Sequence, residues 1–387
     1  MRIAQFVGSL LEPLGGAEQY CLELARWQRD QGHDVTIVTG WVSPGIEKSL
    51  AAEGLPVRPV RNWRPYPPDR KGPKPAAVLF HALDLLGSVR IPGPLRRALA
   101  EPWDVVHVHR FAGFGSAMLR SGRPTAMTVH DYGLVDTSTT LLRHGREVDT
   151  APLVQRLRTR IVNRSVSAAR LIFPTERLRR KHVQWGLELP ARTDVIPHGW
   201  RVSAAAPALP AGDGPVVFLF LGKLIAPKGV ELLLEAWGEG MPGAELWVAG
   251  AGELESAVRA APHVTFLGWV DDTARRAALA GASVLVLPST WPENFPLSAA
   301  EGVLAGLPLI STTVAAPPVL VEGENGLLAT PDAPALREAM QALLDPALRA
   351  RFAAGSRSAA LDLDFDTHGR RIEALYAEML ALRGVTA

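Results

Sequence analysis

The segment from residue 291 to residue 301, with the sequence WPENFPLSAAE, carries residue types suited to ligand chemistry. It follows an apolar run at residues 284–287 that predicts a buried strand, and it opens a predicted helix that ends near Ala305. Pro296 is expected at the first helical position, where its missing N–H is not needed. The amides that follow, beginning with Leu297, would then point out of the helix start, which is a site that binds phosphate.

Two glutamates lie on either side of this helix start. Glu301 is inside the helix, and its two carboxylate oxygens suit a vicinal diol such as ribose. Glu293 precedes the helix on a loop that continues through Asn294 and Phe295, so it can reach another part of the same ligand. Two solvated carboxylates are the alternative, but their placement between a strand and a helix favours a site for a nucleotide sugar.

Two lysines form a second candidate. Residues 220–229 read FLGKLIAPKG and contain Gly222, Lys223 and Lys228 directly after an apolar run at residues 216–221. Open α/β sheets bind ligands at the carboxyl ends of their strands. The lysines can therefore converge on a diphosphate and stabilise the charge of a leaving nucleoside diphosphate.

The first half of the chain offers weaker signals. Gly15 and Gly16 follow the first predicted strand, and glycines there let the backbone approach a ligand closely. His130 ends another predicted strand, where it can donate a hydrogen bond to a sugar hydroxyl. His107 and His109, in the sequence VHVH, are expected to be structural.

Apolar runs alternate with amphipathic segments in both halves, which predicts parallel sheets covered by helices on both faces. The expected strands lie near residues 3–7, 35–38, 105–108, 126–129, 171–173 and 194–196, and near 216–221, 246–249, 264–267, 284–287 and 309–311. We therefore expect an α/β fold of two Rossmann-like domains facing across a cleft. Their predicted bounds are residues 1–197 and 198–365, with a linker at 202–214 and a final helix, 366–387, packing back towards the first domain.

Residues 58–74 interrupt this order with a basic, proline-rich segment. Its charged and aromatic residues are Arg58, Arg61, Trp63, Arg64, Tyr66, Arg70, Lys71 and Lys74. The prolines exclude a regular helix, and a solvated, extended loop is the favoured interpretation. The alternative is a loop that contacts an anionic acceptor or a lipid surface.

Composition narrows the choice of partners and compartment. The chain has 387 residues with 41 basic and 39 acidic side chains, and this balance gives no argument for nucleic acid. A single cysteine, Cys21, excludes an intramolecular disulfide and a cysteine metal cluster. No apolar stretch reaches the ~18 residues of a membrane span. A cytoplasmic protein is expected, with peripheral contact at the inner membrane face left open; the oligomeric state is not predicted.

In combination these motifs resemble the retaining GT-B glycosyltransferases of family 4, and the resemblance covers nearly the whole chain. It implies that Lys223 and Lys228 neutralise the donor diphosphate, that Glu301 holds the ribose and that Glu293 lies beside the donor sugar. It also implies that His130 contacts that sugar.

The resemblance implies further donor contacts. Gly15 and Gly16 would approach the phosphates from the first domain, Gly222 belongs to the lysine loop, and Trp269 would flank the base. Asn294, Phe295, Pro296 and Leu297 would line the phosphate end of the helix. This chain departs from the family at some of these positions. It has Lys223 where the family usually has arginine, and it has Asn294 and Pro296 where the family usually has glycines.

The implied reaction moves a sugar from a nucleoside-diphosphate sugar to a hydroxyl of an unidentified acceptor: a sugar, a lipid-linked glycan or a small molecule. Retention of configuration, no metal and no other cofactor are expected. One alternative is a non-catalytic GT-B subunit that binds the donor. Another is a nicotinamide-dependent oxidoreductase, because VAGAGELE at residues 248–255 approaches the dinucleotide fingerprint, although it lacks the third glycine.

Overall fold

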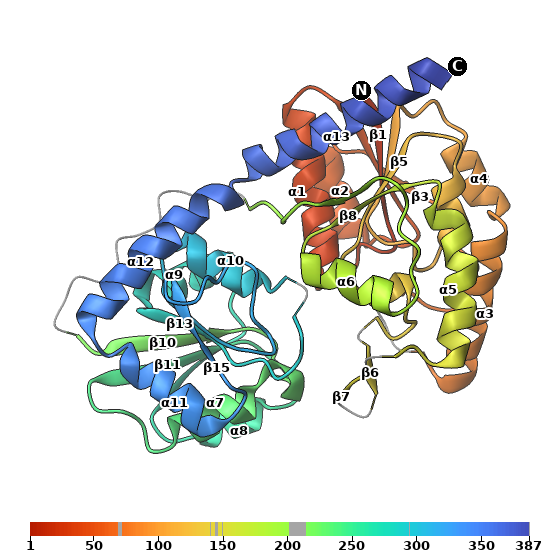
Figure 1. Ribbon diagram of the computed structural model, residues 1–387. Helices are drawn as coiled ribbons and strands as arrows, with labels where there is room; N and C mark the ends of the chain where they lie inside the picture. Colours follow the sequence, from red (N-terminus) through yellow and green to blue (C-terminus); the bar gives the residue numbers. More distant parts are fainter. Residues whose placement is uncertain are drawn as a thin grey trace. The chain divides into compact units, whose positions relative to one another are not determined.

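The computed structural model describes residues 1–68, 72–139, 141–143, 146–148, 150–200, 214–293 and 295–386 (Figure 1). Arg70, Lys71, Asn294 and nearly all of the predicted linker therefore lie outside the described residues. The chain forms two compact units. The first contains Met1–Arg143, Val148–His198 and Asp366–Ala387, and the second consists chiefly of Gly199–Phe365.

The described part of the first unit contains a seven-stranded parallel sheet in the order β3-β2-β1-β4-β5-β8-β9. These strands are β1 (Arg2–Val7), β2 (Asp34–Thr39), β3 (Val57–Pro59), β4 (Val105–Val108), β5 (Thr125–Thr128), β8 (Arg170–Phe173) and β9 (Thr193–Val195). The central strands β4 and β5 are buried along their whole length, as expected for a parallel sheet between helical layers.

Helices cover this sheet. They are α1 (Gly16–Asp30), α2 (Pro44–Ala52), α3 (Lys74–Val89), α4 (Gly93–Leu99), α5 (Leu153–Val166), α6 (Glu176–Gln184) and α13 (Phe365–Thr386), with short 3-10 turns η1 (Ser116–Arg120) and η2 (Tyr132–Leu134). Strands β6 (Leu142–Arg143) and β7 (Arg146–Glu147) form a separate two-stranded sheet. The C-terminal helix α13 belongs to this unit. Its buried Tyr376 shares a hydrogen bond of 2.5 Å with Nδ1 of His107 on β4, which ties the helix to the sheet.

The described part of the second unit has a six-stranded parallel sheet in the order β12-β11-β10-β13-β14-β15. Its strands are β10 (Val216–Leu221), β11 (Ala244–Ala249), β12 (Val264–Gly268), β13 (Val284–Leu287), β14 (Leu309–Thr312) and β15 (Gly326–Ala329). Its helices are α7 (Val230–Trp237), α8 (Glu255–Ala260), α9 (Asp272–Gly281), α10 (Leu297–Leu304), α11 (Ala333–Ala342) and α12 (Pro346–Ala360), with 3-10 turns η3 (Ala226–Lys228) and η4 (Leu361–Leu363). Separate apolar clusters pack on the two faces of this sheet.

The strand order reverses once in each sheet, beside the first strand of the unit. In the first unit β1 lies between β2 and β4, and in the second β10 lies between β11 and β13. At such a point the loops that leave the two neighbouring strands run to opposite faces, which opens a crevice at their carboxyl ends. The loops after β1 and β4, and after β10 and β13, therefore start where ligands bind in open α/β sheets.

Two sequence expectations need correction. Helix α10 begins at Leu297, one residue later than predicted. Pro296 is not its first helical residue but its N-cap, with φ −68° and ψ 119°. The segment 58–74 is not simply solvated, because the Arg64 side chain is buried and one guanidinium nitrogen lies 3.2 Å from Oδ1 of Asp84. Tyr66 of the same segment stacks on Phe80 of α3, with ring centroids 5.1 Å apart. Packing against α3 explains both contacts.

Candidate functional site

The loop after β10 packs directly on the loop after β13 in the second unit. Gly229 ends turn η3 with φ +71°, a left-handed conformation that favours glycine. A Cβ atom on Gly229 would lie 1.9 Å from the carbonyl oxygen of Pro288, so any side chain would separate the two loops. This close approach places the neighbouring Lys228 against the loop that carries Glu293.

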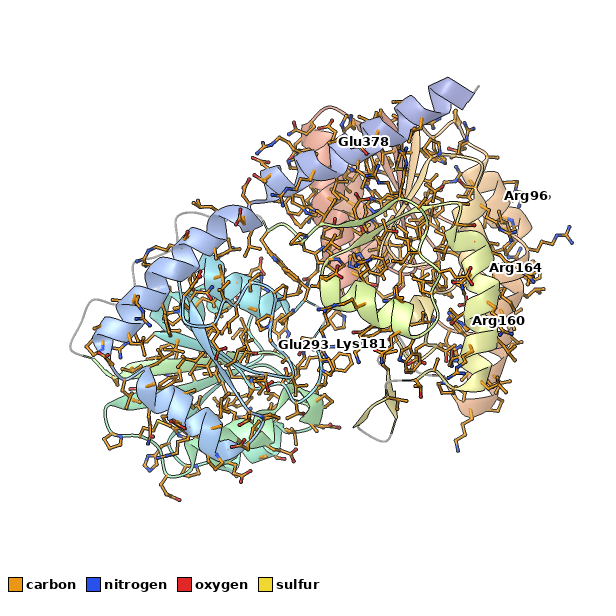
Figure 2. All side chains as sticks on the ribbon, viewed as in Figure 1. Arg96, Arg160, Arg164, Lys181, Glu293 and Glu378 are labelled. Carbon is orange, nitrogen blue, oxygen red and sulfur yellow. The ribbon has the colours of Figure 1, made fainter. Side chains whose placement is uncertain are left out.

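Lys228 and Glu293 are in contact. The Lys228 Nζ donates to Oε1 of Glu293 at 2.6 Å, and the Ser289 hydroxyl donates to the same oxygen at 2.8 Å. The Glu293 side chain, labelled in Figure 2, is 9% exposed, so both bonds are largely shielded from water. Thr312, at the end of β14, donates to the Ser289 carbonyl at 2.5 Å and so fixes the loop. Two residues predicted from separate motifs therefore meet at the reversal point of this sheet.

Helix α10 supplies the next group of predicted residues. Phe295 is buried in the core beneath the helix start, and Pro296 and Leu297 follow it. On the same helix, Oε1 of Glu301 lies 2.9 Å from a guanidinium nitrogen of Arg275 on α9. Burial raises the pKa of the Glu301 carboxyl, and Arg275 partly opposes that rise. No sequence motif pointed to Arg275, since an arginine on an amphipathic helix is usually a surface residue.

The other predicted positions of this unit are on neighbouring loops. Lys223 follows Gly222 after β10 with an exposed side chain, and Trp269 follows β12 and is 72% exposed. The glycines of the VAGAGELE segment have a packing role. A Cβ atom on Gly250 would lie 1.8 Å from the Gly222 oxygen, and one on Gly252 would lie 2.3 Å from the Leu224 oxygen. They let the loop after β11 pack on the lysine loop.

Three charged residues connect the loops that follow β1, β4 and β5 in the first unit. Gly15 is the N-cap of α1 and Gly16 its first residue, and the buried Glu18 lies in the first turn. Arg110, just after β4, is 3.5 Å from Glu18 and 3.4 Å from Asp131, which follows β5. Sequence reasoning did not single out Arg110, because its partners are distant in the chain.

His130 lies between Asp131 and the end of β5. Its Nε2 is 3.3 Å from Nδ1 of His109, and its ring stacks on His198 at 5.1 Å. Burial, together with the nearby positive charge of Arg110, lowers the pKa of His130 to about 3. The imidazole is therefore neutral at physiological pH, able to donate or accept a hydrogen bond but not to supply charge.

The neighbouring histidines divide in role. His107 is fully buried and bonded to Thr128 at 2.8 Å as well as to Tyr376, as a structural histidine should be. His109 is also buried and bonded to Gln5 at 2.6 Å, but in addition it borders a cavity together with His130.

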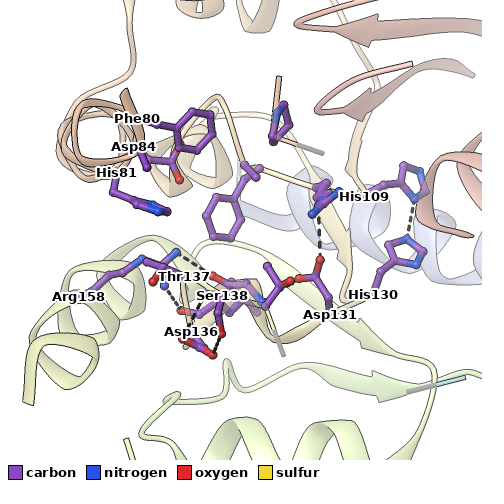
Figure 3. A pocket seen from close by; sticks show the side chains of 18 of the residues that line it. Phe80, His81, Asp84, His109, His130, Asp131, Asp136, Thr137, Ser138 and Arg158 are labelled. Carbon is purple, nitrogen blue, oxygen red and sulfur yellow. Dashed lines mark hydrogen bonds and ion pairs between the residues drawn. The ribbon is translucent and has the colours of Figure 1, made fainter. Parts of the chain in front are cut away.

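This cavity lies within the first unit and has a volume of about 380 Å³ (Figure 3). Helix α3 lines one side with Phe80, His81 and Asp84, and α5 contributes Arg158. Other lining side chains are Tyr66, His109, Arg110, Phe111, Met127, His130, Asp131, Leu134, Asp136, Thr137, Ser138 and Thr139. Aromatic faces beside carboxylates and hydroxyls suit a ring that carries hydroxyl groups. No sequence motif predicted this cavity.

Internal bonds hold the charged groups of the cavity. Asp84 accepts from Arg64 and from the Gly113 amide at 3.1 Å, and burial raises the pKa of its carboxyl. Arg158 donates to the carbonyls of Gly133 and Leu134 at 2.7 and 3.1 Å. These bonds fix the shape of the lining.

Comparison with known proteins agrees with this architecture. The family described as "Glycosyl transferase 4-like domain" matches residues 15–199, and "Glycosyl transferases group 1" matches residues 215–346. A phosphatidyl-myo-inositol mannosyltransferase of Mycobacterium tuberculosis is 26% identical over 97% of this chain and 96% of its own length. The D-rhamnosyltransferase WbpZ of Pseudomonas aeruginosa is 30% identical over 63% of this chain and 65% of its own.

Solved structures share the fold across the whole length. Sucrose-phosphate synthase of Thermosynechococcus elongatus superposes with a TM-score of 0.75 at 22% identity, covering 98% of this chain and 99% of that one. HepE of Anabaena in complex with UDP-glucose gives 0.70 at 18% identity, covering 98% and 100%. The two units therefore form a GT-B fold, the fold class expected from the sequence.

The chain belongs to the GT-B glycosyltransferases of family 4 and is a glycosyltransferase. The family resemblance and the enzyme class expected from the sequence are confirmed, and the oxidoreductase alternative is set aside. The roles of individual site residues stay predictions.

Proposed function

We propose that this glycosyltransferase moves a sugar from a nucleoside-diphosphate sugar to an acceptor hydroxyl, with retention of configuration and without a metal ion. One observation carries the proposal: the 2.6 Å contact between Lys228 and Glu293 lies at the reversal point of the second sheet, beside the start of α10. The relatives named as mannosyl- and rhamnosyltransferases and the structural neighbour with bound UDP-glucose support it.

In this proposal the second unit holds the leaving diphosphate. Lys223 and Lys228 supply positive charge, and the first amides of α10, those of Leu297 and Ser298, donate hydrogen bonds. The amide of Ala299 already donates to the Pro296 carbonyl at 3.1 Å, so the phosphate site ends there. Fixed donors stabilise charge as it develops on the departing group. Glu301 receives the ribose hydroxyls.

Retention follows from attack on the face of the sugar that the diphosphate leaves. The bond from the anomeric carbon to the phosphate oxygen breaks, a bond to the acceptor oxygen forms, and the phosphate oxygen accepts the acceptor's proton. The alternative is a covalent sugar on Glu293, which would require a free carboxylate nucleophile. In the structure Oε1 of Glu293 already accepts two hydrogen bonds, which disfavours that role. Detection of a glycosylated Glu293 peptide by mass spectrometry would refute same-face attack.

The cavity of the first unit is our candidate for the acceptor. The face of Phe80 suits a sugar or cyclitol ring, and Asp84 and Asp131 can accept hydrogen bonds from ring hydroxyls. His130 borders the same cavity as a neutral hydrogen-bonding group.

A thermal-shift panel of UDP, GDP, ADP, dTDP and their sugar conjugates tests the donor class. We expect at least one nucleoside diphosphate to raise the melting temperature, because a ligand that binds only the folded state stabilises it. Unchanged melting with every nucleotide would refute the donor assignment. Slow donor hydrolysis in the presence of EDTA is expected of a metal-independent enzyme, whereas a non-catalytic subunit would show none.

A further inference from the structure

Helix α3 exposes several large apolar side chains, although two of its polar residues are buried. Val78, Leu86 and Val89 are 71%, 61% and 55% exposed, whereas Asp84 and Ser88 on the opposite side are buried. The outward positions recur at helical spacing and therefore form one continuous stripe. A helix of a water-soluble surface normally has the reverse arrangement, so this face is built for an apolar environment.

Helix α5 continues the same surface. It packs beside α3 (Figure 1), and both helices also contact η1. Leu153, Val154 and Leu157 are 73%, 74% and 50% exposed in its first turns. We call the exposed apolar residues of the two helices the apolar face; its members are Val78, Leu79, Leu85, Leu86, Val89, Leu153, Val154 and Leu157.

A row of arginines borders the apolar face. Arg156, Arg160 and Arg164 are four residues apart on α5, so they form a stripe next to that of Leu153 and Leu157. All three are exposed, and Figure 2 shows Arg160 and Arg164 extending from α5.

The exposed charges around the apolar face are positive. Helix α4, which follows α3, adds exposed Arg96 and Arg97. The acidic residue of α3, Asp84, is buried against Arg64, and the sequences of α4 and α5 contain no aspartate or glutamate. The face therefore complements a negatively charged partner. A symmetric dimer through the same face would bring its arginine rows towards each other, which like-charge repulsion disfavours.

We propose that α3 and α5 dock this enzyme on the surface of an anionic lipid bilayer. The apolar face would enter the boundary of the acyl chains, and the arginines would contact headgroup phosphates. No single described helix is long and apolar enough to cross a membrane; the bent pair of α3 and α4 passes by length and composition alone. The proposal therefore concerns contact with the surface.

The same two helices line the cavity, through Phe80, Asp84 and Arg158. A lipid-linked acceptor would thus meet the cavity at the membrane surface. This consequence rests on the proposed function, whereas docking itself needs neither donor nor acceptor.

Flotation with vesicles, in the absence of any nucleotide, tests the docking. We expect the full chain to float with vesicles of phosphatidylcholine and phosphatidylglycerol and to bind pure phosphatidylcholine far more weakly. Leu86→Gln combined with Leu157→Gln should reduce binding at least tenfold, since both side chains are exposed and their loss spares the core. Replacing Arg156, Arg160 and Arg164 by Gln should reduce binding about fivefold per arginine at low salt.

Matched controls carry the same chemical changes elsewhere. Leu361→Gln in the second unit and Arg180→Gln on α6 replace exposed residues outside the face, and we expect both to float like the wild type. Equal binding to neutral and anionic vesicles, or unchanged binding of the Leu and Arg variants, would overturn the proposal. So would a wild-type dimer that the Leu86→Gln variant converts to a monomer, because the face would then be an interface between copies. A donor panel without any thermal shift would count against the proposed function and leave the flotation result intact.

Discussion

At the scale of single residues, the second unit brings together side chains that are far apart in the chain. Lys228 and Glu293 are 65 positions apart yet share a short, shielded hydrogen bond. Glu301 pairs in the same way with Arg275. In each pair, a residue predicted to bind the sugar donor contacts a side chain of opposite charge. Replacing one member therefore changes the site and also leaves the charge of the other member unpaired.

Lys228→Ala should reduce kcat/KM about 100-fold, because one fixed donor to the leaving group is lost. The change also leaves the mostly buried Glu293 carboxylate without its cation, so the free energy of unfolding should fall by about 1–3 kcal/mol. Steady-state kinetics and urea unfolding measure the two effects. Lys48→Ala, which removes an exposed lysine of α2, is the control and should match the wild type. Normal kinetics in Lys228→Ala would remove Lys228 from the site.

Glu301→Gln should weaken binding of the nucleoside diphosphate that stabilises the wild type best, by roughly 10-fold, because the neutral amide is a poorer acceptor for ribose hydroxyls. The same variant should lose the preference for that nucleotide over its 2′-deoxy form. Isothermal titration with both ligands measures the preference. If the variant discriminates between them as the wild type does, Glu301 does not contact the ribose.

At the scale of elements, the packing of one loop on another decides where the lysine loop lies. Gly229 allows contact with Pro288 because it has no Cβ atom. The same device appears where Gly250 meets Gly222. Three loops of the second sheet are therefore held against each other by backbone contacts. Only glycine fits at these positions, because a Cβ atom would collide with the neighbouring backbone.

Gly229→Ala should lower the free energy of unfolding of the second unit by at least about 2 kcal/mol. The new side chain would sit on a left-handed residue and would clash with the backbone of the neighbouring loop. Gly243→Ala is the matched control: its φ is +76°, but a Cβ atom there meets nothing within 4 Å. In the control the free energy of unfolding should fall by only about 1 kcal/mol, which is the cost of placing alanine in a left-handed conformation. Urea unfolding of both variants gives the comparison, and equal losses would mean that the loop contact is not tight.

At the scale of the whole molecule, buried histidines concentrate in the first unit. Burial lowers the pKa of His107 and His130 to about 3 and that of His182 and His368 to about 4. Each is therefore neutral in the folded unit at pH values where it would be protonated in the unfolded chain, whose reference value is 6.5.

Stability should therefore fall as the pH drops from 6.5 towards 4. The unfolded chain binds more protons in this window, so the stabilisation is fully present above pH 6.5 and is lost on acidification. Each buried histidine contributes up to about 1.4 kcal/mol per pH unit. Urea unfolding over this pH range measures the slope. His81→Asn, which replaces an exposed histidine of α3, should keep the wild-type slope. A flat profile between pH 6.5 and 4 would contradict the buried, neutral cluster.

The sequence by itself determined the strands and the loops that follow them. The apolar runs at residues 105–108, 216–221 and 284–287 became β4, β10 and β13 with the expected bounds, because a short strand buried on both faces has a local signal. Lys228 and Glu293 were predicted as site residues in the same way, because a charged residue after such a strand lies at the edge where open α/β sheets bind ligands; their roles stay predictions. The order of these local signals along the chain predicted the fold class and the family.

The tertiary structure decided what depends on contacts between distant segments. Helix α10 starts at Leu297, because the ψ of 119° at Pro296 is extended and leaves this residue outside the helix as its N-cap. Arg110 and Arg275 gained candidate roles through partners on other elements. The cavity and the outward apolar stripe of α3 are likewise invisible in the chain, because hydrophobic periodicity shows that a helix has two faces and only packing decides which one is buried.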